Sequence, residues 1–184
     1  MYPFNKKFFD NWCWKQGINP AWVQQESTRI GTAVSEWAEN RFYGIEVFDA
    51  IPRNKKEEAY LSGVNKFCED WTITNSEQTV YNDEFGYAGT YDALAEKEGT
   101  EYLIDFKTYG AWRGVYDPKS RTSRDKIKKA RLQVSMYLEA LERDLPLAII
   151  VFTPDGGYVE EFVDKSDKWK EWINENKDKL TEDL

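Results

Sequence analysis

The chain has no histidine among its 184 residues. Because imidazole is the usual general base and a common zinc ligand, its absence excludes serine–histidine and cysteine–histidine catalytic arrangements. The two cysteines, Cys13 and Cys68, lie far apart and lack a metal-binding spacing, so we expect reduced, buried thiols and no iron–sulfur cluster. Any catalysis must therefore use carboxylates, lysine and metal ions.

Long apolar segments are also missing. No run approaches the ~20 apolar residues of a membrane span, and residues 1–7 lack the apolar stretch of a signal peptide. We therefore expect no membrane partner and a cytoplasmic location, in the host cytoplasm if a phage encodes the chain. With 41% hydrophobic and 16% aromatic residues, the chain suits one domain spanning residues 1–184.

Charge is unevenly distributed along the chain. The net charge of −8 alone argues against nucleic acid as a partner. Between Arg113 and Arg131, however, eight basic and two acidic residues give a local net of +6, which leaves −14 for the remainder. A basic segment on an acidic body is typical of a surface that binds a phosphate backbone, although a solvated helix face shows the same pattern.

Hydrophobic periodicity predicts the order helix, helix, three strands, helix, two strands, helix. Asn19-Pro20 begins the first long helix, because Asn is a good cap and Pro suits the first turn. Thr122 and Asp125 have the spacing of a capping box at the start of the third helix. The expected elements are helices at about 20–43, 59–71, 122–141 and 164–180, and strands at 72–81, 86–95, 101–108, 147–153 and 158–163. This order implies an α/β fold with a mixed sheet, in which the strand at 147–153 pairs in parallel through a right-handed crossover.

Two carboxylates are expected to face each other in this sheet. If Glu98-Gly99 forms a two-residue hairpin loop, counting outward places Asp92 opposite Asp105. Alternation then puts both carboxylates and Lys107 on one face, and Tyr91 on the other, apolar face. Facing like charges destabilise a sheet, so we expect a cation between them, of which a divalent metal is the simplest. A register slipped by one residue, or a solvated hairpin, would remove this site.

Four motifs occur in a fixed order: Gly31-Thr32-Ala33-Val34-Ser35-Glu36-Trp37-Ala38-Glu39, Gly89-Thr90-Tyr91-Asp92-Ala93-Leu94, Leu103-Ile104-Asp105-Phe106-Lys107-Thr108 and Gln133-Val134-Ser135-Met136-Tyr137. Together they resemble the PD-(D/E)XK nucleases, and within them the RecB-like exonuclease branch. The resemblance covers about residues 27–152. It implies a restriction-endonuclease-like αβββαβ core at about 20–163, followed by a C-terminal helix at about 164–180.

The resemblance implies roles for the central residues. Asp92 and Asp105 bind Mg²⁺ or Mn²⁺ together with the main-chain carbonyl of Phe106, and Lys107 orients the attacking water and stabilises charge in the transition state. These roles suit the residue types, because hard oxygen ligands prefer these ions and the bound ions lower the pKa of water.

The first helix departs from the family pattern. Ser35 stands where many RecB-like members have a metal-binding histidine, and a hydroxyl is a poor ligand by comparison. We expect Glu39 or Glu36 to supply the missing ligand, unless both are solvated. Glu39 is preferred because it lies one turn beyond Ser35 on the same face, whereas Glu36 is about 100° round the helix.

The expected DNA contacts lie after the third strand. Gln133 and Tyr137 share a helical face, and the family's matching residues contact DNA or water. The connection at 109–122 interleaves aromatic and basic side chains, which suits stacking on unpaired bases while holding phosphates. The other expected DNA-binding residues are Trp112, Arg113, Lys119, Arg121, Arg124 and Lys128.

These features predict a Mg²⁺- or Mn²⁺-dependent deoxyribonuclease, an exonuclease that acts on single-stranded or frayed DNA ends. Two alternatives remain. A DNA-binding subunit without activity on the same fold would account for Ser35, and a structure-specific endonuclease such as a junction resolvase would use the same carboxylates.

Overall fold

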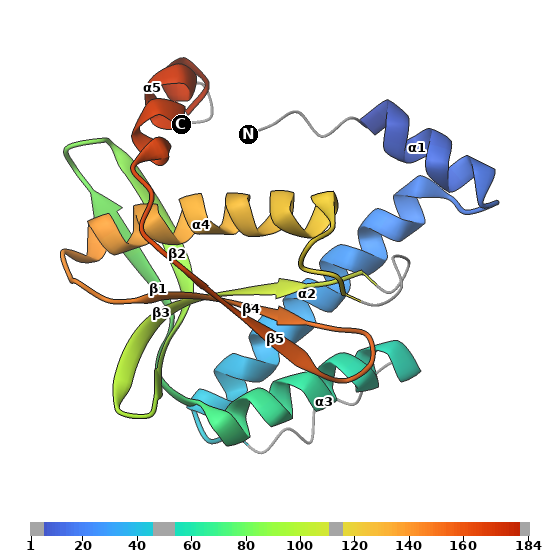
Figure 1. Cartoon of the computed structure of the whole chain (residues 1–184), viewed down its shortest axis with the longest axis horizontal. Coiled ribbons are helices and arrows are strands. Elements are labelled where there is room, and N and C mark those ends of the chain that lie inside the picture. The colour runs from blue at the N-terminus through green and yellow to red at the C-terminus, as the bar shows by residue number, and fades with distance from the viewer. Residues whose placement is uncertain (1–5, 46–53, 111–115, 181–184) are drawn as a thin grey trace.

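A five-stranded sheet lies between helices in the computed structural model, which describes residues 6–45, 54–110 and 116–180 (Figure 1). The helices are α1 (Lys6–Lys15), α2 (Pro20–Phe42), α3 (Lys55–Asp70), α4 (Arg121–Leu141) and α5 (Lys168–Leu180). The strands are β1 (Thr72–Asn82), β2 (Tyr87–Lys97), β3 (Thr100–Thr108), β4 (Leu147–Phe152) and β5 (Tyr158–Val163). The α/β fold predicted from the sequence is confirmed.

The strands lie in the order β1-β2-β3-β4-β5. The β3–β4 pair is parallel and the other three pairs are antiparallel, so the sheet is mixed as predicted. α4 connects the two parallel strands and packs on the sheet. All six residues of β4 are buried, as expected for a central strand covered on both faces.

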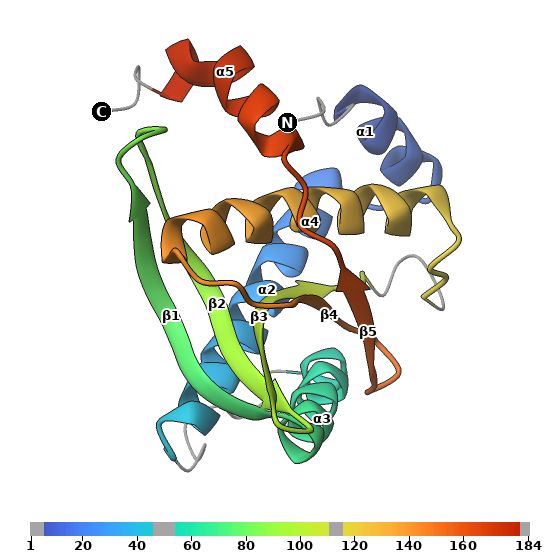
Figure 2. The ribbon, with the colours of Figure 1, turned by 60° about the vertical axis from the view of Figure 1, so that its left-hand side comes forward.

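Two apolar clusters fill the space above and below the sheet. The cluster under α2 and α3 includes Trp37, Phe67 and Ile104, and the cluster under α4 includes Val134, Leu138 and Leu103. Adjacent residues of β3 therefore face opposite layers. Figure 2 shows α4 crossing the sheet on the side opposite α3, and the β1–β2 hairpin extending towards α5.

Caps define where the long helices begin. Asn19 caps α2 as predicted, since its Oδ1 accepts a hydrogen bond from the backbone N–H of Ala21 at 2.9 Å. The predicted cap of α4 is wrong. Ser120 is the cap, and its Oγ accepts from the backbone N–H of Ser123 at 3.2 Å. Thr122 already lies inside the helix, because the serine two residues earlier satisfies the first free N–H groups.

Two further features differ from the sequence prediction. α1 was not predicted, because its ten residues carry no acid in the first turn, although Phe8, Phe9, Trp12 and Cys13 recur at helical spacing. Both cysteines are free, but only Cys13 is buried, whereas Cys68 is partly exposed. No helix in the described parts of the chain is long and apolar enough to span a membrane.

Candidate functional site

The β2–β3 hairpin sets the position of the two carboxylates. Glu98 and Gly99 both have positive φ, 52° and 78°, as a two-residue type I′ loop requires. Pairing runs outward from Lys97 opposite Thr100 to Ala93 opposite Ile104. The next pair in this register is Asp92 opposite Asp105, so the predicted register is confirmed.

The ladder between β2 and β3 ends one pair before the carboxylates. Beyond Ala93 and Ile104 no further pairing joins these two strands within the described residues. Instead, Oδ2 of Asp92 accepts a hydrogen bond from the backbone N–H of Phe106 at 2.6 Å. A side chain thus replaces the backbone partner of β3, and it holds Asp92 beside Asp105 where the strands separate.

Asp105 is a buried carboxylate, with 1% of the residue exposed. Nζ of Lys107 lies 2.5 Å from its Oδ2. Its Oδ1 has no hydrogen-bond donor within residues 6–45, 54–110 and 116–180. The pKa of Asp105 is raised to about 7, chiefly by burial and also by the charge of Asp92, while Lys107 acts to lower it. A buried carboxylate oxygen without a hydrogen-bond donor lowers the stability of the folded state. A cation bound to Oδ1 would offset this loss.

Asp92 shares this environment. Burial raises the pKa of the Asp92 carboxyl, and the ammonium of Lys107 and the N–H of Phe106 oppose the increase. The two carboxylates therefore share one ammonium, so two negative charges lie close to a single positive one. Lys107 therefore supplies part of the positive charge that the sequence predicted between the two carboxylates as a divalent metal ion.

One further acid, Glu77, lies near Asp92, and Glu39 lies near Glu77. Burial raises the pKa of Glu77 in β1, and the charges of Asp92 and Glu39 raise it further. Glu39, on α2, therefore lies near Glu77, and its role as the ligand in place of Ser35 stays a prediction. Glu36 is exposed, and Ser35 is partly buried on the same helix.

Glu77 also breaks the alternation of side chains. Its backbone is left-handed, with φ of 49°, and it lies between the pairs Ser76–Ala93 and Gln78–Tyr91. The predicted position of Tyr91 beside Ala93 is wrong, because Tyr91 is buried in the cluster under α4. Tyr91 and Leu94 lie in this cluster while Ala93 and Ala95 lie in the other, so the two-residue repeat of β2 is interrupted between Tyr91 and Ala93, next to Glu77 on β1.

α4 supplies the other wall of the site. Nε2 of Gln133 donates to the Tyr137 hydroxyl at 2.9 Å, so the expected pair acts as one unit. A Cβ on Gly89 would lie 2.5 Å from Cε1 of Tyr137, so the ring packs directly on the β2 backbone. Burial raises the pKa of Tyr137, and the charges of Asp105 and Asp92 add to this increase, against the opposing hydrogen bond from Gln133.

Lys126 also borders the site, although the sequence predicts it only as part of the basic segment between Arg113 and Arg131. Its ammonium donates to the carbonyl of Thr108, at the end of β3, and its charge acts to lower the pKa of Asp105. It precedes Gln133 by seven residues, two helical turns, so the three side chains Lys126, Gln133 and Tyr137 share one flank of α4. That spacing was visible in the sequence.

The remaining basic residues lie elsewhere. Arg124 and Lys128 line a pocket between α4 and β5, on the opposite flank of α4 from Tyr137. Lys119 and Arg121 are exposed near the start of α4. Trp112 and Arg113 fall outside the described residues. Among the predicted DNA-binding residues that the structure describes, Gln133 and Tyr137 thus lie beside the carboxylates, whereas the basic residues lie away from them.

The donor set fits a hard divalent cation. Asp92 and Asp105 offer carboxylate oxygens, and the Phe106 carbonyl faces the same side as its N–H, which points to Asp92. No group of three or more Asp, Glu or Cys side chains that could hold a metal occurs in the described segments. Two carboxylates and one carbonyl are still sufficient, because Mg²⁺ keeps several waters and is usually held by one or two carboxylates.

Comparison with known proteins does not assign a family. No family model matches the chain, and no curated protein matches it. The crystal structure of SSO0001 aligns over 60% of this chain and 49% of its own chain, with 16% identity and a TM-score of 0.36. A likeness at this level says nothing about function.

Proposed function

We propose that this chain is a Mg²⁺- or Mn²⁺-dependent DNA phosphodiester hydrolase of the PD-(D/E)XK type, in the RecB-like branch. The observation that carries the proposal is the Asp92–Asp105 pair, with the orphaned Oδ1 of Asp105, beside Lys107. Strongly perturbed carboxylates that gather around one ammonium are typical of functional sites.

Asp92, Asp105 and the Phe106 carbonyl would hold the cation. When bound, it would supply a water of lowered pKa and positive charge beside the scissile phosphate. Asp105 would then be in its ionised form. The carboxylates thus act as ligands, and no residue of this site has to serve as a histidine-like base.

Lys107 acts on the reacting groups. Its side chain is 25% exposed, so the ammonium contacts Asp105 on one side and remains accessible on the other. An ammonium in this position donates hydrogen bonds to the attacking water and to a nonbridging phosphate oxygen. It therefore orients the nucleophile and stabilises the charge that develops in the transition state.

Tyr137 and Gln133 position the substrate. The hydrogen bond from Gln133 occupies the Tyr137 oxygen as an acceptor and leaves its proton to donate. Because the Tyr137 pKa is raised, the hydroxyl remains protonated at neutral pH. It is therefore suited to donate to a phosphate oxygen or a water, but not to act as a base.

The depth of the site favours unpaired DNA. Since Asp105 is 1% exposed, the scissile phosphate has to approach closely between α4 and the sheet. A single strand or a frayed end bends into such a site more readily than a stiff duplex. We therefore propose exonuclease action on single-stranded or frayed ends.

The test is cleavage of labelled linear single-stranded, circular single-stranded, duplex and branched DNA with Mg²⁺, Mn²⁺ or EDTA. We expect metal-dependent products from linear strands, loss of at least a hundredfold in rate in Asp105→Asn, and a normal rate in the control Asp144→Asn, whose residue is exposed. Cleavage of circular or branched DNA would indicate an endonuclease. No metal-dependent product, or full activity in Asp105→Asn, contradicts the proposal.

A DNA-binding subunit without activity is the second candidate, because Ser35 lies where the family has a histidine. It predicts DNA binding with no heat of Mg²⁺ or Mn²⁺ binding in titration calorimetry. A Glu39→Gln variant separates the two candidates. It weakens metal binding if Glu39 replaces the histidine, and changes nothing in a decayed site.

A further inference from the structure

The first two turns of α4 carry charge of the wrong sign for helix stability. The N-terminal end of a helix bears partial positive charge, so acids stabilise it and cations do not. The first turn of α4 has no acid and contains Arg121 and Arg124. In the second turn, Lys126 and Lys128 accompany a single acid, Asp125, whose Oδ2 lies 3.8 Å from Nε of Arg121. Helix stability therefore does not account for a cation such as Arg124 at this end of α4, which points to an anionic partner.

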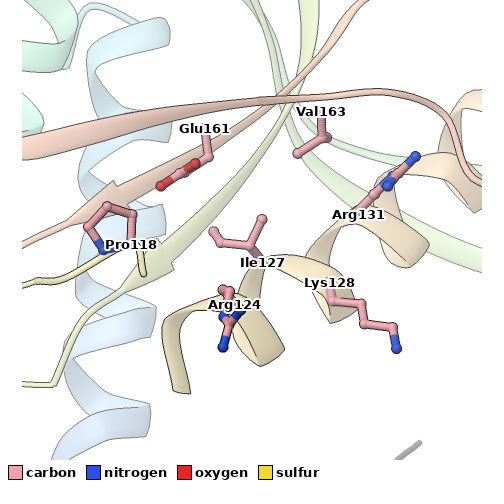
Figure 3. Close-up of a pocket in the computed structure, with 7 residues that line it drawn as sticks. All are labelled: Pro118, Arg124, Ile127, Lys128, Arg131, Glu161 and Val163. Carbon is pink, nitrogen blue, oxygen red and sulfur yellow. The ribbon is translucent and has the colours of Figure 1, made fainter. Parts of the chain in front are cut away.

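A pocket of about 240 Å³ adjoins this end of α4 (Figure 3). It lies between α4 and β5 and is lined by Pro118, Arg124, Ile127, Lys128, Arg131, Glu161 and Val163. Three of these side chains are cationic and only Glu161 is acidic. Oε1 of Glu161 accepts a hydrogen bond from the Tyr116 hydroxyl at 2.9 Å, which offsets part of its charge.

The cations are arranged along the rim of the pocket. Arg131 is fixed, since its Nε donates to the carbonyl of Asp164 at 2.6 Å. Arg124 and Lys128 are exposed, and Figure 3 shows their head groups projecting from α4 away from β5. Arg124 has no carboxylate partner in the portion of the chain that the structure describes. Spread, outward-facing cations suit an extended polyanion better than one compact ion.

This surface is close to the carboxylate site. Asp105 pairs with Ile149, and Ile149 pairs with Glu161, so Asp105 and Glu161 are two strands apart in one row. That separation is about 10 Å at the usual strand spacing. α4 lies between the two regions, with Lys126 on the flank near Asp105 and Arg124 on the opposite flank, which lines the pocket.

We propose that Arg124, Lys128 and Arg131 bind the phosphodiester backbone of the substrate strand, which passes round the N-terminal end of α4 from the carboxylate site. The inference rests on the proposed function for the identity of the strand. The flank at Lys126, Gln133 and Tyr137 holds the scissile phosphate, and the flank at β5 holds neighbouring phosphates.

The test is the salt dependence of binding to a fluorescent single-stranded oligothymidine in EDTA, where metal-dependent cleavage is absent. Each lost phosphate contact reduces the slope of log K against log salt by about 0.7 for single strands, so Arg124→Ala/Lys128→Ala should lose about 1.4. We expect a roughly tenfold weaker Kd at physiological salt. The matched control, Lys15→Ala/Lys55→Ala, removes two exposed lysines outside this surface and should leave both quantities unchanged.

One measurement separates lost binding from lost folding. The melting temperature of Arg124→Ala/Lys128→Ala should equal or exceed that of the wild type, because a cation at a helix N-terminus is unfavourable.

Equal affinity and salt slope in this variant and the wild type overturn the inference even if the wild type cleaves DNA. Weaker binding in this variant alone supports the inference even if the wild type hydrolyses nothing, in which case the proposed function fails separately.

Discussion

Asp105 is a buried acid whose pKa of about 7 lies well above its ordinary value of 3.8. Because the folded state then binds more protons than the unfolded chain, its contribution to stability is lost as pH rises through this window. Without metal, the melting temperature should therefore fall between pH 4 and pH 7. Asp105→Asn should remove most of this decrease, which scanning fluorimetry at several pH values measures.

A bound metal ion should offset the loss of stability that the ionised Asp105 carboxylate causes. A ligand at a hundred times its Kd stabilises a protein by about 2.7 kcal/mol, or roughly 5–10 °C for a chain of this size. We expect Mg²⁺ or Mn²⁺ to raise the melting temperature of the wild type at pH 8 and to leave Asp105→Asn unchanged. An equal increase in both proteins would show that the ion binds elsewhere.

Gly89 is required by its neighbour rather than by its own backbone. An added methyl group would lie 2.5 Å from Cε1 of Tyr137, so Gly89→Ala should displace the ring and cost about 1–3 kcal/mol. In a Tyr137→Ala background the same change should cost almost nothing. A double-mutant cycle in urea measures this coupling, and additive effects would mean that the contact is absent.

The sequence predicted the positions of some site residues but not of others. The meeting of Asp92 and Asp105 followed from a two-residue turn and counting, because local geometry fixes the register. The positions of Glu77 and Lys126 did not follow. Glu77 depends on a left-handed residue within a strand, and the contact of Lys126 with Thr108 depends on how α4 crosses the sheet.

At the scale of elements, α4 positions both halves of the site, and its start depends on one serine. Ser120→Ala should destabilise the protein by ~1 kcal/mol, because Oγ of Ser120 satisfies the N–H of Ser123. Thr122→Ala, the matched control at the cap expected from the sequence, should cost at most a few tenths of a kcal/mol. Chemical denaturation measures both, and a larger loss in Thr122→Ala would reassign the cap.

The positions of most elements were predictable because each carries its own signals. Alternating residues defined the strands, and Asn19-Pro20 marked the start of α2. The face of Tyr91 was not predictable, since the alternation of side chains in β2 is interrupted between Tyr91 and Ala93 and no residue type there signals it. Local patterns thus identified the elements, while the tertiary arrangement determined which side chains enter the site.

In the molecule as a whole, the single sheet packs against an apolar cluster on each of its two faces. Leu103 and Ile104 are fully buried neighbours in β3 that belong to different clusters. Leu103→Ala and Ile104→Ala should each cost about 2–5 kcal/mol and lower one shared melting transition. Calorimetry that resolves two transitions, with each variant affecting a different one, would contradict a single cooperative domain.

The hydrogen bond from Phe106 to Asp92 has a spectroscopic consequence. An amide proton that points at a carboxylate experiences the full change in field when that group gains a proton or a cation. In an amide NMR spectrum, the Phe106 signal should therefore move more on metal titration than its neighbour Ile104, whose backbone is paired within the ladder. One resonance would then report occupancy of the site without a substrate, a label or a turnover.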